Sequence, residues 1–201
     1  MLWPWSSPVP LIALRGPRVL LRLPQMGDYE AWHELRRGSR DFLRPFEPRW
    51  TEADLSRRVF AARVRRAREE AEEGSDYSFF IFTNDAATLV GGITLSNIRR
   101  RAAQFVNLGY WMGQPFAGQG LMSEAVGTSL PFVFDTLDLH RIHAAFLPGN
   151  IASRRVLEKN AFVEEGFAEK YLQINGRWED HVLFGLTKER YETARYTRRL
   201  V

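Results

Sequence analysis

The sequence predicts an α+β fold built around a mixed β-sheet. Short segments rich in β-branched and aromatic residues recur between turn signals in the middle and at the end of the chain, as antiparallel hairpins require. Four helical apolar stripes lie between these segments. The regular alternation of strand and helix that a dinucleotide-binding fold needs is absent, so this sequence does not indicate that fold.

The predicted elements follow one another in a definite order. The strands span residues 18–24, 77–83, 88–95, 104–112, 140–147, 167–174 and 178–186, and the helices span 28–37, 51–73, 120–137 and 151–160. Asp28 can cap the first helix, and Thr51 with Asp54 has the capping-box pattern that opens the second. Two prolines and two aromatic residues predict an ordered loop at residues 42–48. Asn175-Gly176 is the turn of the last hairpin.

Length and composition limit the class of protein. The 201 residues fit a single domain over 1–201 that can bury its own core. The sequence has no cysteine, which excludes disulfides, thiolate metal sites and a cysteine nucleophile, and we expect no metal centre. This composition fits the reducing cytoplasm.

The termini and the charge bear on location and partners. No apolar run has membrane-spanning length, and residues 1–14 do not have the pattern of a signal peptide. We expect residues 1–16 to be an extended arm or a first strand, and residues 190–201 to be a charged tail. The net charge of +4 and the pI of about 9.7 fit a polyanionic partner such as a nucleic acid, a ribosome or a nucleotide cofactor, and fit an ordinary soluble surface equally well.

A glycine-containing turn joins the strand that ends at Met112 to the helix that follows. Gly118 and Gly120 flank Gln119, and glycines let a backbone approach a ligand closely. The first N–H groups of a helix have no internal partners, so the backbone of residues 117–123 could hold a pyrophosphate. No lysine with Ser or Thr follows the glycines, which excludes a P-loop, and an ordinary strand-to-helix turn remains an equal interpretation.

A second polar segment lies at residues 148–162. Asn150 follows a predicted strand, and its side chain can cap the next helix or hydrogen-bond an amide-bearing ligand. Ser153 lies in the first helical turn, near enough to share that ligand. Read alone, both residues fit helix capping.

Together the two segments resemble the GNAT acetyltransferases. The resemblance rests on a Gly-x-Gly turn, a helix, and a strand ending in Asn-x-x-Ser-x-x-Val-Leu-Glu-Lys-x-x-Phe at 150–162. Within this superfamily the chain is most similar to the ribosomal-protein N-terminal alanine acetyltransferases, in the segments 42–48, 108–111, 118–125 and 165–182. The resemblance implies a mixed, mainly antiparallel sheet, splayed between two parallel strands, with helices on both faces.

The resemblance also implies acetyl-CoA as the cofactor. Its pyrophosphate would meet backbone N–H groups of Ala117, Gly118, Gln119, Gly120, Leu121 and Met122. The pantetheine arm would pair like an extra strand with the backbone near Trp111 and Met112, and Asn150 and Ser153 would lie beside the arm and the thiol. The family pattern at the loop is Gln/Arg-x-x-Gly-x-Gly/Ala. Ala117 replaces its polar residue and Met122 its last small residue, so backbone recognition is kept and side-chain support is lost.

Acetyl transfer needs a neutral amine, a polarised thioester carbonyl and a proton for the departing thiolate. A backbone N–H near Met112 could polarise the carbonyl. Some family members use a tyrosine late in the helix after the asparagine as the acid, and that position here is Leu157. Ser153 is then the candidate acid or water-holder, with a role in the first helical turn as the alternative.

A general base is harder to find. Some members have a glutamate in the strand before the asparagine, whereas residues 140–147 contain no carboxylate. His143 could point inward, as a base or as a buried structural histidine, and Glu47, Asp180 and His181 are further options. Asp180 also fits a structural carboxylate at a strand end. The candidate catalytic residues are therefore Ser153, Asn150 and Asp180.

The reaction chemistry favours an N-terminal acceptor. An α-amino group has a pKa of about 7.7–8.0 and a lysine of about 10.4, so an α-amine needs less help to become neutral. We expect direct attack in a ternary complex, with a protein N-terminus as acceptor, such as that of a ribosomal protein. We also expect a cytoplasmic location, with ribosome association but without membrane or direct DNA binding. The alternatives are a small-amine acetyltransferase, acting on a polyamine or an antibiotic, and a non-catalytic ribosome- or RNA-binding module on the same fold.

Two further groups of side chains have two interpretations each. Aromatic residues, Trp32, Phe42, Phe46, Trp50, Tyr110 and Trp111, could line an acceptor groove or pack in the core. Arginines between 57 and 68, followed by glutamates between 69 and 73, indicate a solvated helix face or a ribosome-facing patch.

Overall fold

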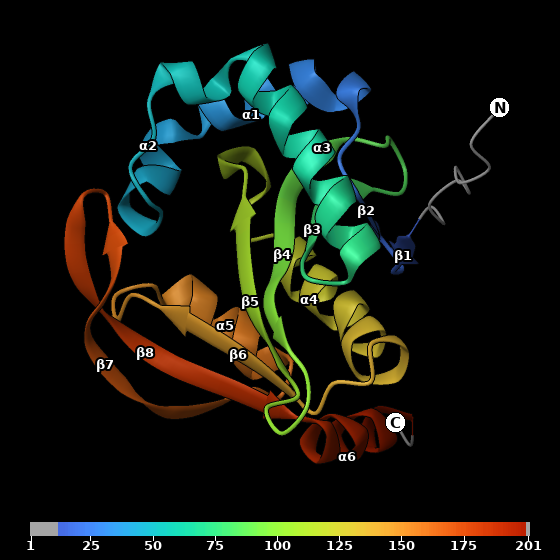
Figure 1. Cartoon of the computed structure of the whole chain (residues 1–201). Helices are drawn as coiled ribbons and strands as arrows, with labels where there is room; N and C mark the ends of the chain where they lie inside the picture. Colours follow the sequence, from blue (N-terminus) through green and yellow to red (C-terminus); the bar gives the residue numbers. More distant parts are fainter. Residues whose placement is uncertain (1–11, 200–201) are drawn as a thin grey trace, which may run out of the picture.

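The computed structural model describes residues 12–199 and contains an eight-stranded sheet in the order β1-β2-β3-β4-β5-β6-β8-β7 (Figure 1). The strands are β1 Ala13–Arg15, β2 Val19–Arg22, β3 Tyr77–Thr83, β4 Leu89–Arg99, β5 Phe105–Met112, β6 Arg141–Phe146, β7 Val163–Ile174 and β8 Arg177–Thr187. Among these strands β5 and β6 form the one parallel pair. The prediction of a mixed, mainly antiparallel sheet is confirmed.

Helices cover both faces of the sheet. The α-helices are α1 Tyr29–Gly38, α2 Arg40–Leu43, α3 Arg57–Glu73, α4 Leu121–Pro131, α5 Ile151–Lys159 and α6 Lys188–Arg199. Short helical turns are η1 Met26–Asp28, η2 Arg44–Phe46, η3 Glu52–Leu55, η4 Gln114–Phe116 and η5 Phe132–Thr136. In Figure 1, α1, α2 and α3 lie on one side of the strands, and α4 and α5 lie on the other. None of the helices within residues 12–199 is long and apolar enough to cross a bilayer.

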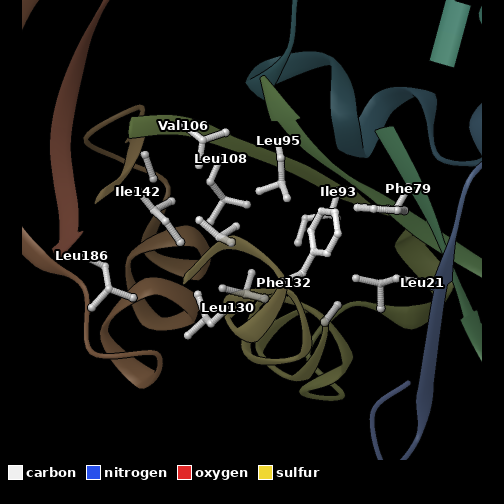
Figure 2. Close-up of a cluster of buried hydrophobic side chains, with 14 of the residues drawn as sticks. Leu21, Phe79, Ile93, Leu95, Val106, Leu108, Leu130, Phe132, Ile142 and Leu186 are labelled. Carbon is white, nitrogen blue, oxygen red and sulfur yellow. The ribbon is translucent and has the colours of Figure 1, made fainter. Parts of the chain in front are cut away.

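Alternation of side chains along β3 explains the two layers. Successive strand residues point to opposite faces. Phe79 and Ile81 belong to the large core beneath α4, where Figure 2 shows Phe79 and Phe132 packed together. Phe80 and Phe82 belong to a smaller core on the opposite face, which also contains Trp32 and Phe60 of α1 and α3.

The sheet splits between its two parallel strands. β5 pairs with β6 from Phe105–Arg141 to Leu108–Ala144. Beyond Leu108, β5 continues to Met112 beside β4, while β6 continues beside β8 to Phe146. The expected splay is therefore present, and it leaves an opening between the end of β5 and the end of β6.

The segment 51–73 is not the single helix that was predicted. The Thr51 N–H donates to Asp54 Oδ2 at 2.6 Å, so the capping box exists, but it caps the short turn η3. Ser56 is extended, with ψ 150°, and its Oγ accepts from Val59 N at 3.5 Å. Because Ser56 supplies a second N-cap, the long helix α3 begins at Arg57.

Other boundaries also differ from the predictions. The predicted ordered loop at 42–48 is largely helical, in α2 and η2, because proline is tolerated in the first turn of a helix. The predicted helix 120–137 ends at Pro131 and continues as the wider turn η5. Strand β7 begins four residues before its predicted start at 167. The charged segment from 190 lies within α6 up to Arg199, and residues 1–11 of the expected arm lie outside the described range.

Candidate active site

The end of β5 presents main-chain polar groups to the opening in the sheet. Gly113 N donates to Val90 O at 2.9 Å, and Met112 stands opposite Gly91 in the β4–β5 register. In an antiparallel pair, alternate residues direct their N–H and C=O groups toward the partner strand. Trp111 therefore bonds toward β4, while Tyr110 and Met112 direct their N–H and C=O groups toward the opening.

The glycine turn after β5 leaves the start of α4 without a side-chain cap. Gly118 and Gly120 have φ values of +76° and +79°, which L-residues with a side chain rarely adopt. Gly120 is the N-cap, and no side chain accepts from the first N–H groups of α4. The N–H groups of Leu121, Met122 and Ser123 therefore have no side-chain cap.

An arginine from a distant strand supports this turn. Arg18 Nη1 donates to Gln119 O at 3.3 Å, and Arg18 Nε pairs with Glu124 Oε2 at 2.7 Å. Gln119 is further fixed because its Nε2 donates to Pro115 O at 2.9 Å. Ala117 leaves the turn without the family's polar side chain, and Arg18 supplies a cation beside it. Sequence reasoning missed Arg18, because the contact joins residues about one hundred positions apart and no local pattern marks it.

Asn150 and Ser153 stand on the other side of the opening. Asn150 Oδ1 accepts from Ser153 N at 3.0 Å, so Asn150 caps α5. The Asn150 Nδ2 group makes no hydrogen bond with any other residue in the described range, whereas the Ser153 side chain hydrogen-bonds Tyr110. The Asn150 Nδ2 group is therefore available to a ligand in the opening.

Tyr110 of β5 contacts α5 across the opening. Its hydroxyl donates to Ser153 O at 3.3 Å. Burial raises the pKa of Tyr110 to about 12, and a separate hydrogen bond with the Ser153 side chain opposes this shift only in part. The phenol is therefore a neutral donor near neutral pH. It links β5 to α5, and sequence reasoning had assigned it only to the core or the acceptor groove.

The candidate bases each have structural partners. Asp180 Oδ1 accepts from Lys170 N at 2.8 Å, which fixes the bulge in the β7–β8 hairpin. His181 is buried, and its Nδ1 lies 2.9 Å from Glu179 O. His143 packs edge-on against Phe105, and its pKa is lowered chiefly by burial and also by Arg141.

Glu47 is held in an ion pair. Its carboxylate accepts from Arg36 Nη2 at 2.7 Å and Nη1 at 3.0 Å, and from Trp50 Nε1. Leu157, at the family's tyrosine position, is fully buried in the core. Among the described residues, no carboxylate is hydrogen-bonded to Ser153 or to Asn150 Nδ2.

The segment that follows η2 and contains Glu47, here called the helical loop, meets the tip of the last hairpin above the opening. Asn175 N, at the tip of the β7–β8 hairpin, donates to Glu47 O at 3.0 Å. The Arg36 guanidinium lies 4.9 Å from the Trp111 ring and 5.0 Å from the Trp50 ring. A hollow of about 240 Å³ beside Trp50 is lined by residues that include Arg36 and Arg63. Cations and aromatic rings therefore dominate this side of the site.

The other predicted aromatics and arginines divide between core and surface. Trp32 is buried against Phe60, whereas Phe42 and Phe46 are exposed. On α3, exposed arginines pair with glutamates four residues later, as a solvated helix face would: Arg65 with Glu69, Arg66 with Glu70 and Arg68 with Glu72.

The fold and this arrangement define an acetyltransferase of the GNAT class. The acetyltransferase (GNAT) domain family matches residues 18–163. The chain therefore belongs to this family, and it is an acetyl-CoA-dependent N-acetyltransferase, as the resemblance implied.

Known relatives cover nearly the whole chain. The chain is 35% identical over 185 residues to [Ribosomal protein uS5]-alanine N-acetyltransferase of Escherichia coli (strain K12), covering 91% of this chain and 94% of the relative. It is 35% identical to the probable N-acetyltransferase YjcK of Bacillus subtilis (strain 168), covering 86% and 96%.

Two solved structures have the same fold. The ribosomal-protein-S5-alanine acetyltransferase from Vibrio fischeri has a TM-score of 0.82 at 29% identity, covering 90% of this chain and 98% of that one. Mycobacterium smegmatis RimJ in complex with CoA-disulfide has a TM-score of 0.82 at 30% identity, covering 92% and 93%.

Proposed function

We propose that the chain acetylates the α-amine at the N-terminus of a protein, and that this protein is a ribosomal protein. The observation that carries the proposal is the opening between β5 and β6, which has the glycine turn at one end and the contact between Asn175 and Glu47 above it. A relative whose name states ribosomal-protein alanine N-acetylation is 35% identical over 91% of the chain. This similarity supports the choice of acceptor. The proposal includes association with the ribosome and action in the cytoplasm.

The cofactor assignment follows from the backbone. Acetyl-CoA supplies the acetyl group as a thioester. The N–H groups of residues 118–122 would hold its pyrophosphate, since no side chain caps α4 and the two glycines carry no Cβ toward the ligand. The Ala117 N–H, which the resemblance had included, instead donates to Gln114 O at 3.2 Å. Met112 would offer the main-chain pairing for the pantetheine arm, with Tyr110, because the Trp111 backbone bonds toward β4.

The catalytic assignment rests on the polar side chains at the start of α5. The Ser153 hydroxyl would protonate the departing thiolate or hold a water that does so, and Asn150 Nδ2 would orient the arm. The Met112 N–H would polarise the carbonyl. Asp180 is assigned to the shape of the hairpin through Lys170 N rather than to proton transfer. An α-amine can attack directly with the help of solvent, since its pKa is about 7.7–8.0.

The small-amine alternative fits the site less well. A polyamine is polycationic and would require an excess of carboxylates around the acceptor path. Among the described residues, the smaller hollow beside Trp50 has arginines and no carboxylate, and the larger one has three arginines against Glu47 and Asp54. The non-catalytic alternative requires that acetyl-CoA does not bind.

The test has two steps. Thermal unfolding with acetyl-CoA, with adenosine as control, should give a stabilisation of about 2.7 kcal/mol when the ligand concentration is about 100 times its Kd. Acetylation assays should then compare a peptide beginning with alanine, the same peptide with a blocked N-terminus, and spermidine. Acetylation of the free peptide alone supports the proposal. Acetylation of spermidine alone would favour the small-amine enzyme, and absence of cofactor binding would favour the binding module.

A further inference from the structure

Three arginines surround a small hollow where the helical loop meets the last hairpin. Arg40, Arg44 and Arg49 line this arginine hollow together with Trp50 and Asn175, and its volume is about 120 Å³. The guanidinium fork matches the geometry of a carboxylate, to which it donates two parallel hydrogen bonds. A volume of this size fits one small anionic group.

The positive charge of the arginine hollow is only partly balanced. Arg40 Nη1 lies 3.5 Å from Glu52 Oε2, in a pair whose side chains are both well exposed. Arg44 Nε donates to a neutral partner, Asn175 Oδ1, at 3.4 Å. Arg49 makes no hydrogen bond or ion pair with another described residue. Two of the three guanidinium groups therefore have no carboxylate partner, so an incoming anion would relieve their repulsion.

A short row of packed side chains separates the arginine hollow from the opening in the sheet. The Arg36 guanidinium stands 4.9 Å from the ring of Trp111, the neighbour of Met112, and 5.0 Å from the ring of Trp50. Trp50 lines the arginine hollow. An extended peptide advances about 3.3 Å per residue, so it would cover this span in roughly three to four residues.

We infer that the arginine hollow binds a carboxylate side chain of the acceptor polypeptide, at about the third to fifth residue from the acetylated N-terminus. The inference rests on the proposed function, because it needs an N-terminal peptide in the opening. A carboxylate at that distance from the N-terminus is then a feature of the acceptor sequence that this enzyme selects.

The test uses peptides that begin with alanine and are otherwise uncharged. A single glutamate, or glutamine as its neutral match, is placed at each position from two to six, and kcat/KM is measured with saturating acetyl-CoA. For wild type, glutamate at one or more of positions three to five should raise kcat/KM about tenfold over glutamine, which corresponds to about 1.4 kcal/mol. In Arg49→Gln and in Arg44→Gln this ratio should fall toward one, while the rate with the uncharged peptide stays the same.

The control variant is Arg37→Gln. Arg37 is an exposed arginine on the neighbouring helix that lines neither hollow, so its loss removes the same charge without touching the hollow. Retention of the glutamate preference in this variant supports the inference. A glutamate-to-glutamine ratio near one at every position in wild type, or an unchanged ratio in Arg49→Gln, overturns it.

Two further outcomes would each exclude carboxylate binding in a different way. If no peptide is acetylated, with or without glutamate, the proposed function fails and this inference fails with it. If glutamate has no effect but an uncharged-peptide reaction is inhibited by a short single-stranded RNA in an Arg49-dependent way, the hollow is a phosphate site and the carboxylate inference is overturned.

Discussion

The Tyr110 hydroxyl donates a hydrogen bond to the main-chain oxygen of Ser153 at 3.3 Å, across the opening where the parallel strands part. This bond joins the last residues of β5 to the first turn of α5. It connects the strand that carries the Met112 N–H with the helix that carries Asn150 and Ser153. The two sides of the site are therefore joined by one partly buried phenol.

Tyr110 should make stability depend on alkaline pH. Its pKa is raised to about 12 in the folded protein, chiefly by burial, against about 10 in an unfolded chain. The folded state holds the proton more tightly, so this contribution is fully present below pH 10 and is lost as the pH rises toward 12. The loss attributable to Tyr110 is about 2–3 kcal/mol. Urea unfolding at pH 9 to 12 should show a shallower decline for Tyr110→Phe than for wild type. Tyr171→Phe, at an exposed tyrosine, should keep the wild-type slope, and equal slopes for all three proteins would contradict this prediction.

Arg18 should affect cofactor binding. Arg18→Gln removes the bonds to Gln119 O and Glu124, so the glycine turn loses its support. Because Arg18 is more than half exposed, the expected effect is modest: a three- to tenfold rise in KM for acetyl-CoA with kcat nearly unchanged. Arg15→Gln, an exposed arginine on β1, is the matched control. An equal KM for both variants would show that net charge alone matters.

Substitutions at Asn150 and Ser153 should separate effects on stability from effects on cofactor binding and catalysis. Asn150→Ala removes the cap on α5 and should cost about 1 kcal/mol in the free energy of unfolding. Asn150→Asp keeps the capping oxygen and removes only the Nδ2 donor, so it should be stable and yet bind the cofactor more weakly. Ser153→Ala should leave stability unchanged and lower kcat by about tenfold to a hundredfold. An unchanged kcat for Ser153→Ala would assign Ser153 to helix structure.

Glu47 should stabilise the site rather than accept a proton. Its ion pair with Arg36 is largely buried, with side-chain exposures of 18% and 11%, so Glu47→Gln leaves a buried guanidinium without its carboxylate. The expected loss is about 2–3 kcal/mol of unfolding free energy, measured by urea denaturation. Glu30→Gln, in an exposed pair with Arg57, should lose less than about 0.5 kcal/mol. In Glu47→Gln the rise of kcat/KM with pH should persist, because the acceptor amine itself titrates. Loss of that rise in a folded variant would identify Glu47 as the base.

Much of the fold could be predicted from the sequence, because the decisive signals are local. The glycine turn, the cap at Asn150 and the Asn175-Gly176 hairpin each depend on residues a few positions apart, and each is found where it was predicted. The order of strands and helices follows from apolar periodicity, which also acts over short distances. Competing local signals were harder to read: Thr51 and Ser56 both cap, and the long helix α3 starts after the second.

The sequence by itself determined the family, the glycine turn before α4 and the polar pair at the start of α5. Only the tertiary structure decided which distant side chains support them: Arg18 beside the glycine turn, Tyr110 against Ser153, and Asn175 against Glu47. The physical reason is that backbone propensity and capping are fixed by neighbours in the chain. A contact between residues tens of positions apart exists only when the layers of helix and sheet have packed, and its partners leave no periodic trace in the sequence.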